Sequence, residues 1–216
     1  MMIVRRGTCM NLMKIKEQLQ HAQPSFIGEE SAFRSAVVVP LVDINGELHV
    51  LFEVRSLTMR KQPGDISFPG GKIDATDASP QAAALRELYE ELSVPPSSVD
   101  VLAELSPLII SPSFVIYPFV AKVDMREVNT LNRDEVAEVF TVPLQWLLDC
   151  DPDLHHVFMK PTPADGFPFD KIMNGEDYEW RARAMDEWFF EYNDYVIWGL
   201  TARILKYFLE RIQTDF

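Results

Sequence analysis

The stretch SFPGGKIDATDASPQAAALRELYEELSV, from Ser67 to Val94, restricts the fold of this chain more than any other. Its second half carries Glu87, Glu90 and Glu91, and at about 100° per residue a helix would place these side chains on one face. Carboxylates at this spacing repel one another, so a solvated helix gains nothing from the arrangement. Because Mg²⁺ and Mn²⁺ prefer oxygen ligands, a divalent cation would remove the repulsion. The pattern therefore indicates a metal-binding helix, with a charged surface helix as the alternative.

The residues around these glutamates support both the helix and a loop ahead of it. Ser79 is suited to cap the helix, and Pro80 is suited to its first position. Gly70 and Gly71 lie in a loop that can bring backbone carbonyl groups close to the acidic face. The apolar side chains expected on the opposite face are Leu85, Leu88, Tyr89 and Leu92.

The length and the charge of the chain limit the kind of protein that it can be. A chain of 216 residues, 47% of them apolar, is expected to form one domain with a substantial core. We expect that domain over residues 31–212, after an N-terminal extension with a short helix over residues 1–30. A net charge of −13 argues against nucleic acid as a partner, so an anionic substrate must be attracted by local cations.

Cysteine usage and hydropathy indicate where the protein works. Cys9 and Cys150 lie far apart and without metal-like spacing, which is typical of reduced thiols in a cytoplasmic protein. No apolar run approaches the roughly 20 residues that cross a bilayer, so we expect no membrane partner. The basic N-terminus leaves a mitochondrial presequence open, beside an additional segment ahead of a folded part that begins at Met10 or Met13.

The periodicity of the remaining chain predicts strands and helices on either side of the acidic helix. Helices are expected over residues 11–23, 145–148 and 195–212, and strands over 33–42, 48–54, 99–105 and 114–123. Asn45 and Gly46 predict the hairpin turn between the first two strands, and Pro118 predicts an edge position or a bulge. We expect an irregular insertion over residues 149–193.

The segment RSLTMRKQPG, residues 55–64, is the most basic part of this acidic chain. Arg55, Arg60 and Lys61 stand within it with no acid before Asp65. They are solvated loop charges or donors for phosphate, and their place just before a metal-binding helix favours phosphate.

Further polar and aromatic residues offer weaker signals. Glu135 and Glu138 are the acids outside the helix that are best placed to reach the site, although a solvated surface explains either one alone slightly better. His155 and His156 are adjacent, so on a strand they cannot both face one site, and we do not expect them to be ligands. The aromatic residues within 178–192 favour a core or an interface over a base-stacking platform.

The acidic helix and its loop resemble the Nudix box, whose pattern is Gly-x5-Glu-x7-Arg-Glu-apolar-x-Glu-Glu-x-Gly-apolar. Here the sequence RELYEELSV, residues 86–94, follows Gly71 and Asp77. Asp77 stands in place of the first glutamate, eight residues rather than seven lie between it and Arg86, and Ser93 replaces the usual glycine.

A second resemblance narrows the family. The sequence LFEVRS from Leu51, with Arg60, Gly64 and SFPGG from Ser67, is similar to the signature of the coenzyme A pyrophosphatase subfamily. That subfamily also carries an aspartate and one additional residue inside the box, and it ends in a segment similar to IWGLTARIL, residues 197–205. The resemblance covers residues from about Phe33 to about Leu209 and is loose between about 149 and 193.

The resemblance implies a Nudix fold of the mixed α/β (α+β) class, in which a mixed β-sheet lies between helices and the box forms a loop-helix-loop motif. It implies hydrolysis of the pyrophosphate of coenzyme A or its derivatives, dependent on Mg²⁺ or Mn²⁺, into 3′,5′-ADP and 4′-phosphopantetheine. The partner would be this small molecule, and the chain could form a homodimer. The implied metal ligands are Glu87, Glu90, Glu91 and Gly71; the implied catalytic residues are Arg86 with Glu87 or Glu135 as the base; and the implied substrate-binding residues are Arg55, Arg60, Lys61, Ser67 and Gly70.

Two alternatives remain open from the sequence. The first is a Nudix pyrophosphatase that acts on NADH, ADP-ribose or a nucleoside triphosphate, and the residues from Arg55 to Gly71 argue against it. The second is a non-catalytic Nudix-like binding module, and the complete set of box glutamates argues against that.

Overall fold

The computed structural model describes residues 11–20 and 26–213. Our expectations for Cys9, for Met10 and for a presequence lie outside these residues. The helices are α1 (Leu12–Leu19), α2 (Pro80–Leu92), α3 (Leu144–Asp149) and α4 (Gly199–Ile212). None of them has the length and the apolar composition that a membrane-spanning helix requires.

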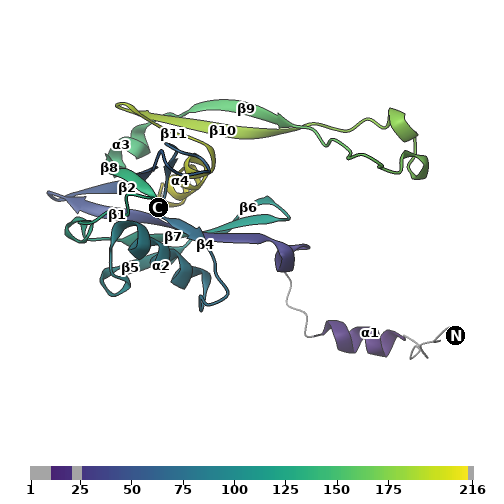
Figure 1. Cartoon of the computed structure of the whole chain (residues 1–216), viewed down its shortest axis with the longest axis horizontal. Coiled ribbons are helices and arrows are strands. Elements are labelled where there is room, and N and C mark those ends of the chain that lie inside the picture. Colours follow the sequence, from purple (N-terminus) through teal and green to yellow (C-terminus); the bar gives the residue numbers. More distant parts are fainter. Residues whose placement is uncertain (1–10, 21–25, 214–216) are drawn as a thin grey trace.

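The strands form a large mixed sheet and a separate three-stranded sheet (Figure 1). The large sheet contains β1 (Phe33–Ile44), β2 (Glu47–Arg55), β3 (Ile66–Ser67), β4 (Gly70–Lys72), β5 (Asp100–Glu104), β6 (Leu108–Ser111), β7 (Phe114–Lys122) and β8 (Val136–Pro143). The small sheet contains β9 (Asp153–Met159), β10 (Arg183–Tyr192) and β11 (Tyr195–Ile197).

The large sheet is mixed because its two longest neighbours run in the same direction. Strands β1 and β7 are parallel along their whole shared length, whereas β2, β4, β5, β6 and β8 each pair antiparallel with a neighbour. The path β3-β2-β1-β7-β5 forms the body of the sheet, with β8 on β2, β4 on β1 and β6 on β7. The mixed sheet that the sequence predicts is confirmed.

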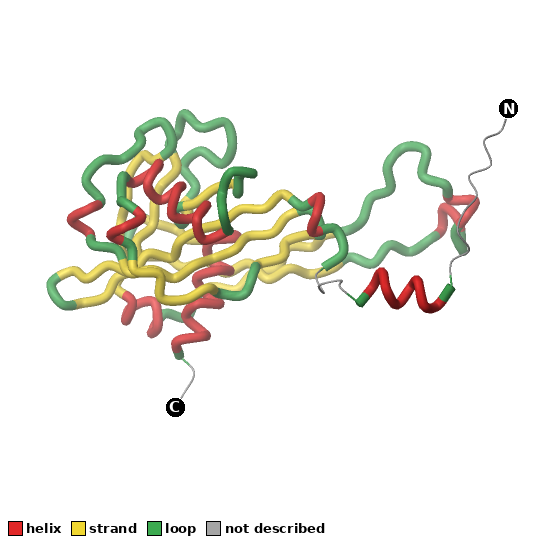
Figure 2. The backbone as a smooth tube through the Cα atoms, turned by 90° about the horizontal axis from the view of Figure 1, so that it is seen from below, coloured by secondary structure: helices red, strands yellow, loops and turns green. Residues whose placement is uncertain are grey.

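Helices cover both faces of the sheet because the buried strands are apolar on both sides. Successive residues of a strand point to opposite faces, so Leu51 packs in the core beside α2 and Phe52 in the core beside α4. On the helices, Leu88 of α2 and Leu205 of α4 are fully buried in these two cores. The sheet therefore lies between α2 on one side and α3 with α4 on the other (Figures 1 and 2).

Strands β9 and β10 form a long two-stranded arm beyond this body, and the chain between them, residues 160–182, lies at its far end (Figures 1 and 2). Every residue of β9 is exposed. By contrast, Phe190 near the end of β10 is fully buried against α4. The insertion that the sequence places at residues 149–193 thus combines an exposed ribbon with a segment of β10 that belongs to the core.

Most expected elements are present, and their ends follow from local chemistry. The hairpin between β1 and β2 turns at Asn45 and Gly46, both with positive φ, and Asp43 Oδ1 accepts the Gly46 N–H at 2.8 Å. The expected helix over 195–212 is corrected, because it begins only at Gly199. Tyr195–Ile197 instead pair with Phe190–Tyr192 to form β11.

Pro118 does not lie in an edge strand, so of the two expected positions, an edge or a bulge, the edge is wrong. Strand β7 has β1 on one side, with β5 and β6 on the other. Pro118 lies opposite the connection between β5 and β6, where its carbonyl accepts the Leu105 N–H at 2.9 Å. A proline is tolerated in this central strand because the neighbouring ladder is interrupted there.

Helix α2 ends at Leu92, and the next residue, Ser93, adopts a left-handed conformation with φ 60° and ψ 19°. Its N–H donates to the Tyr89 carbonyl at 2.9 Å, so the residue completes the C-terminal cap. Glycine takes this conformation without the clash that a Cβ atom causes.

We predict that Ser93→Gly stabilises the protein by about 0.5–1 kcal/mol, because it removes this clash. In a chain of this size, the midpoint of thermal unfolding should rise by roughly 1–4 °C. Ser93→Ala is the matched control, since it keeps the Cβ atom and should bring no gain. A midpoint for Ser93→Gly at or below that of the Ser93→Ala variant would contradict the prediction.

Candidate active site

Helix α2 carries its glutamates at three different depths. Ser79 caps it by accepting the Ala82 N–H at 3.1 Å, as expected. Glu91 is only 3% exposed, Glu87 is half-buried, and the Glu90 side chain is 50% exposed. The three carboxylates therefore run from the core to the solvent along one side of the helix.

The expected apolar face of α2 needs a correction. Tyr89 is 52% exposed and does not join the core. Ala83 and Ala84 are fully buried in its place, because their small side chains let the helix lie close against the sheet. With the helix rotated about its axis in this way, Glu91 is buried in the core.

Arg86 holds the acidic helix to the loop that precedes it. Its guanidinium donates to both oxygens of Asp77 at 3.0 Å, to Glu87 Oε1 at 2.8 Å and to Glu90 Oε2 at 3.1 Å. It also donates to the Lys72 carbonyl at 3.0 Å. The bonds between Arg86 and Asp77 lower the pKa of that carboxyl, and the bonds to Asp77 and then Glu87 raise the pKa of Arg86. One cation thus fixes the loop and partly neutralises two of the glutamates.

The two glycines of the loop bring the backbone directly onto these carboxylates. A Cβ atom at Gly71 would lie 2.5 Å from the carboxyl carbon of Glu87, so a side chain there would displace this carboxylate. The N–H of Gly70 donates to Glu91 Oε2 at 2.9 Å. Strand β4 is held in this position by antiparallel pairing with β1, where Gly71 faces Ala36.

Sequence reasoning missed a further carboxylate, Glu53 on β2. It is 1% exposed, its Oε1 accepts the Ser67 hydroxyl at 2.9 Å, and its Oε2 has no hydrogen-bond partner among the described residues. Burial raises its pKa from 4.5 to about 7, and the charges of Glu135 and Glu87 add to the rise. An acid between Phe52 and Val54 in a buried strand was the signal that could have identified it.

Repulsion and burial act on the whole group of carboxylates. Burial, followed by the charge of Glu53, raises the pKa of Glu91 well above its usual range. Burial also raises the pKa of Glu87, against the opposing effect of Arg86. The charge of Glu135 contributes to all three increases.

Glu135 and Glu138 occupy different environments. Glu135 precedes β8, and its carbonyl accepts the Ser56 N–H at 2.7 Å beside the end of β2. Glu138 is exposed and accepts the Tyr195 hydroxyl at 3.2 Å. Of these two acids, Glu135 is therefore the one that acts on the carboxylate group.

This donor set fits a hard divalent cation. The buried Oε2 of Glu53 has no partner among the described residues, and the cleared backbone at Gly71 lies against a carboxylate. In the described part of the chain, no three His, Cys, Asp or Glu side chains already stand in the arrangement of a metal site. Arg86 and the Gly70 N–H hold Glu87, Glu90 and Glu91 instead, so these side chains must turn to ligate a cation.

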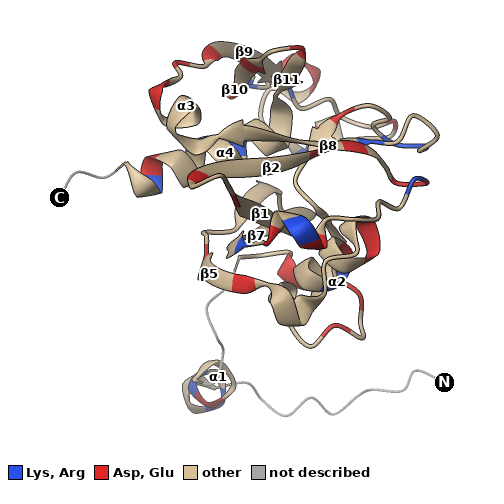
Figure 3. Ribbon diagram, turned by 90° about the vertical axis from the view of Figure 1, so that its left-hand side faces the viewer, with Lys and Arg blue, Asp and Glu red and all other residues tan. Residues whose placement is uncertain are grey.

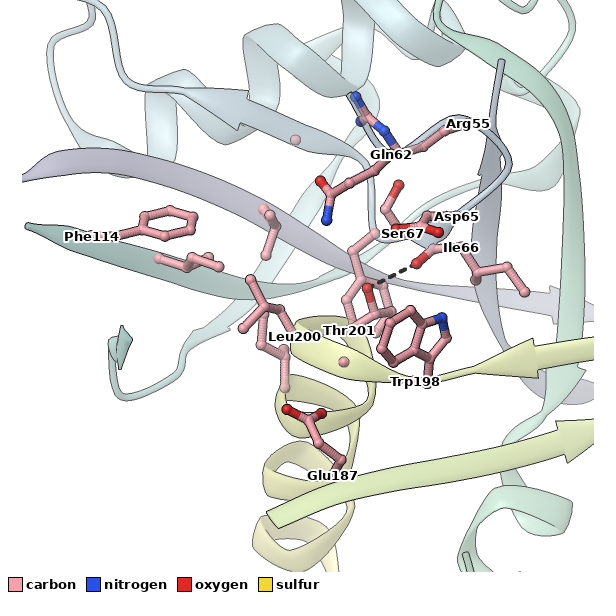
Figure 4. A pocket seen from close by; sticks show the side chains of 16 residues that line it. Arg55, Gln62, Asp65, Ile66, Ser67, Phe114, Glu187, Trp198, Leu200 and Thr201 are labelled. Carbon is pink, nitrogen blue, oxygen red and sulfur yellow. Dashed lines mark hydrogen bonds between the residues drawn. The ribbon is translucent and has the colours of Figure 1, made fainter. Parts of the chain in front are cut away.

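A cavity of about 340 Å³ adjoins the carboxylates on the α4 side of the sheet (Figure 4). Three of the expected substrate-binding residues line it, namely Arg55, Ser67 and Gly70. Ser67 and Gly70 are the same residues that donate to Glu53 and Glu91, so a ligand in the cavity would lie next to the carboxylates. The buried Nε of Arg55 has no partner among the described residues.

The other two expected substrate-binding residues lie away from the cavity wall. Arg60 and Lys61 are exposed in the loop between β2 and β3, and neither is among the described residues that line the cavity. They belong to the loop that joins β2 and β3, the strands of Glu53 and Ser67, and Figure 3 shows acidic side chains on α2 in red.

The adjacent histidines lie on opposite sides of β9, as expected. His155 contacts the ring of Phe189 edge-on, with ring centroids 5.5 Å apart. His156 Nδ1 lies 3.0 Å from Asp186 Oδ1 on the next strand. They do not converge on one site.

Proteins of one family match this chain by sequence. The model of the NUDIX domain family matches residues 32–164. The peroxisomal coenzyme A diphosphatase of Mus musculus is 39% identical over 174 residues, which are 81% of this chain and 68% of that protein. An uncharacterised Nudix hydrolase, NudL of an Enterobacter species, is 34% identical over 80% of this chain and 79% of its own. Among solved structures, a Nudix hydrolase of M. smegmatis has 19% identity and a TM-score of 0.45, over 54% of this chain and 74% of its own.

We predict that the protein without divalent cations loses stability as the pH rises. The folded pKa of Glu53, about 7, lies above its ordinary value of 4.5, so the proton on Glu53 stabilises the fold and is lost as the pH rises through 7. The difference corresponds to roughly 3 kcal/mol. In EDTA, the midpoint of thermal unfolding should therefore decrease as the pH is raised from 5.5 to 8.5.

Glu53→Gln is the matched variant, since it keeps the shape of the side chain and cannot ionise. Its unfolding midpoint should exceed that of the wild type at pH 8.5 and approach it at pH 5.5. Parallel pH profiles for the two proteins would contradict the assignment to Glu53.

Proposed function

The chain belongs to the Nudix hydrolase family and is a pyrophosphatase, and from that premise we propose that it hydrolyses coenzyme A or its derivatives. The products would be 3′,5′-ADP and 4′-phosphopantetheine or its acyl form. The observation that carries this proposal is a cavity whose wall residues Ser67 and Gly70 bond directly to the buried carboxylates. The name of the Mus musculus relative supports the same substrate.

We assign the cation-binding role to Glu87, Glu90, Glu91 and the carbonyl of Gly71, and we add Glu53 to the set. A bound Mg²⁺ or Mn²⁺ would neutralise charge on the phosphate oxygens and make the attacking water more acidic. Glu53 and Glu91 are buried, so the core restricts their side chains, whereas Glu90 is exposed. Glu91 would exchange its bond to the Gly70 N–H for the cation.

Arg86 would position the ligands rather than touch the substrate. Its bidentate bond to Asp77 fixes the guanidinium, and its remaining N–H groups hold Glu87 and Glu90. When these carboxylates turn toward a cation, the bond to Asp77 keeps Arg86 in place.

Arg55 would bind the pyrophosphate. It lines the cavity, and its buried Nε is a donor that lacks an acceptor within the described residues. We propose Glu87 or Glu135 as the base that takes a proton from the attacking water, since both carboxylates belong to the group around Glu53. Arg60 and Lys61 would bind the 3′-phosphate of the substrate, which is separate from the pyrophosphate.

The test of the proposal is product identification by mass spectrometry with Mg²⁺ or Mn²⁺. Coenzyme A, NADH, ADP-ribose and dGTP are supplied separately, and coenzyme A should be cleaved with the highest kcat/KM. A preference for one of the other three would establish a different Nudix pyrophosphatase. Binding without turnover of any of them would establish a binding module.

Location and assembly stay as predictions. A cytoplasmic location is expected from the cysteine usage, although the relative from Mus musculus is named as peroxisomal. A homodimer is likewise a prediction from the family resemblance.

We predict that Glu91→Gln and Glu90→Gln each lower kcat by about 100-fold or more, because each removes an anionic ligand from the cation site. The fold should survive, since glutamine fills the same volume, and circular dichroism would verify this. Glu104→Gln, at an exposed position on β5, is the control and should keep wild-type kcat. Full activity in both α2 variants would remove these residues from the metal site.

We predict that Arg60→Ala raises KM for coenzyme A by more than it raises KM for 3′-dephospho-coenzyme A. The arginine would contact the 3′-phosphate, which only the first substrate carries, and a charged hydrogen bond contributes about 1.5–3 kcal/mol. Lys122→Ala, at an exposed position at the end of β7, controls for the loss of one positive charge. Equal increases for both substrates would show that Arg60 does not recognise the 3′-phosphate.

A further inference from the structure

A carboxylate that the proposed mechanism does not use lies in the same cavity. Glu187 of β10 is 9% exposed and lines the cavity, with its carboxylate directed toward the start of α4 (Figure 4). Its Oε2 is buried and has no hydrogen-bond partner among the described residues. None of the ion pairs in the described part of the chain includes it.

Such a group is costly unless a ligand completes it. A buried acceptor that lacks a donor costs about 1–3 kcal/mol, and more when it is charged. An acid is also unfavourable beside a site for pyrophosphate, because like charges repel. The part of the ligand next to Glu187 should therefore carry N–H or O–H donors and no negative charge.

The cavity has a different character at its two ends. Arg55 and Gln62 lie at one end, and Glu187 lies on the opposite side, beyond Leu200 and Thr201 (Figure 4). The apolar residues that line the cavity are Val37, Ile66, Phe68, Phe114, Ile116, Trp198, Leu200 and Ile204. One end suits phosphate, and the remainder suits an uncharged, partly apolar chain.

We infer that this cavity receives the pantetheine half of the substrate and that Glu187 accepts a hydrogen bond from one of its amide N–H groups. The inference rests on the proposed function, since it assigns one half of coenzyme A to this cavity. The pantetheine half is uncharged beyond its phosphate, and its amides supply the donors that Glu187 lacks. Its methyl and methylene groups match the apolar wall that includes Trp198 and Leu200.

The nucleotide half fits this end less well. Its 3′-phosphate would be placed near Glu187, an acid that lines the cavity at this end. Arg60 and Lys61, on the exposed loop, offer that phosphate a better environment outside the cavity. Glu187 is thus a specificity residue that selects the amide-bearing chain and disfavours a second phosphorylated group.

The experiment compares inhibition by the two halves of the substrate. The inhibition constants of 4′-phosphopantetheine and of 3′,5′-ADP are measured against coenzyme A hydrolysis for the wild type, Glu187→Ala and Glu187→Gln. Glu187→Ala should raise the constant for 4′-phosphopantetheine at least about tenfold and change that for 3′,5′-ADP less than about twofold. Glu187→Gln should recover part of the loss, because its amide oxygen still accepts a hydrogen bond.

Glu191→Ala is the matched control, because Glu191 is an exposed acid on the same strand, and it should change neither constant. Trp198→Leu provides an independent variant should the changes at Glu187 prevent folding. It should raise the constant for 4′-phosphopantetheine alone.

Each contrary result has a distinct meaning. A selective loss of 3′,5′-ADP binding would overturn the inference by placing the adenine half in the cavity. Unchanged constants for both halves in a folded Glu187→Ala protein would overturn it as well, leaving Glu187 a structural residue. Both results presuppose that the wild type cleaves coenzyme A, whereas a wild type that fails to do so would refute the proposed function itself.

Discussion

Repulsion among buried carboxylates is the constraint on which the site depends. Glu53 and Glu91 are almost fully buried; burial raises the pKa of both, and the charge of Glu53 raises that of Glu91 further. The protein offsets this only in part, with the Ser67 hydroxyl on Glu53, the Gly70 N–H on Glu91 and the guanidinium of Arg86 on Glu87. The fold therefore holds a concentration of negative charge that a divalent cation would relieve, and the same packing that stabilises the domain creates the demand for that cation.

The sheet explains how that charge is brought beside a cavity. Leu51 packs in the core beside α2, and Glu53, two residues further along β2, is joined to the carboxylate group. Ser67 on the neighbouring strand β3 bonds to Glu53 and also lines the cavity beside α4. Ser67 thus connects the carboxylates to the cavity, because its hydroxyl bonds to Glu53 and the same residue forms part of the cavity wall.

Sequence reasoning identified what is encoded locally and missed what is assembled at a distance. The cap at Ser79, the hairpin at Asn45 and the glutamates of α2 follow from neighbours within one or two turns of chain. Glu53 was missed because β2 is buried on both faces and shows no alternation of polar and apolar residues, so only its place between Phe52 and Val54 distinguishes it. Glu187 could not be found at all, because only the packing of β10 against α4 carries it from an irregular insertion into the cavity.

The departures from the family pattern of the box have a physical explanation in the turn before α2. Asp77 is one methylene shorter than the glutamate of the pattern, and one additional residue separates it from Arg86. The chain folds back there, since the Asp77 N–H donates to the Asp74 carbonyl and the Asp74 N–H donates to Asp77 Oδ2. This turn presents the shorter side chain with both oxygens toward the guanidinium, so the bidentate pair is kept. The additional residue in the loop thus compensates for the shorter acid. Arg86 therefore stays bound to Asp77 and still donates to Glu87 and Glu90.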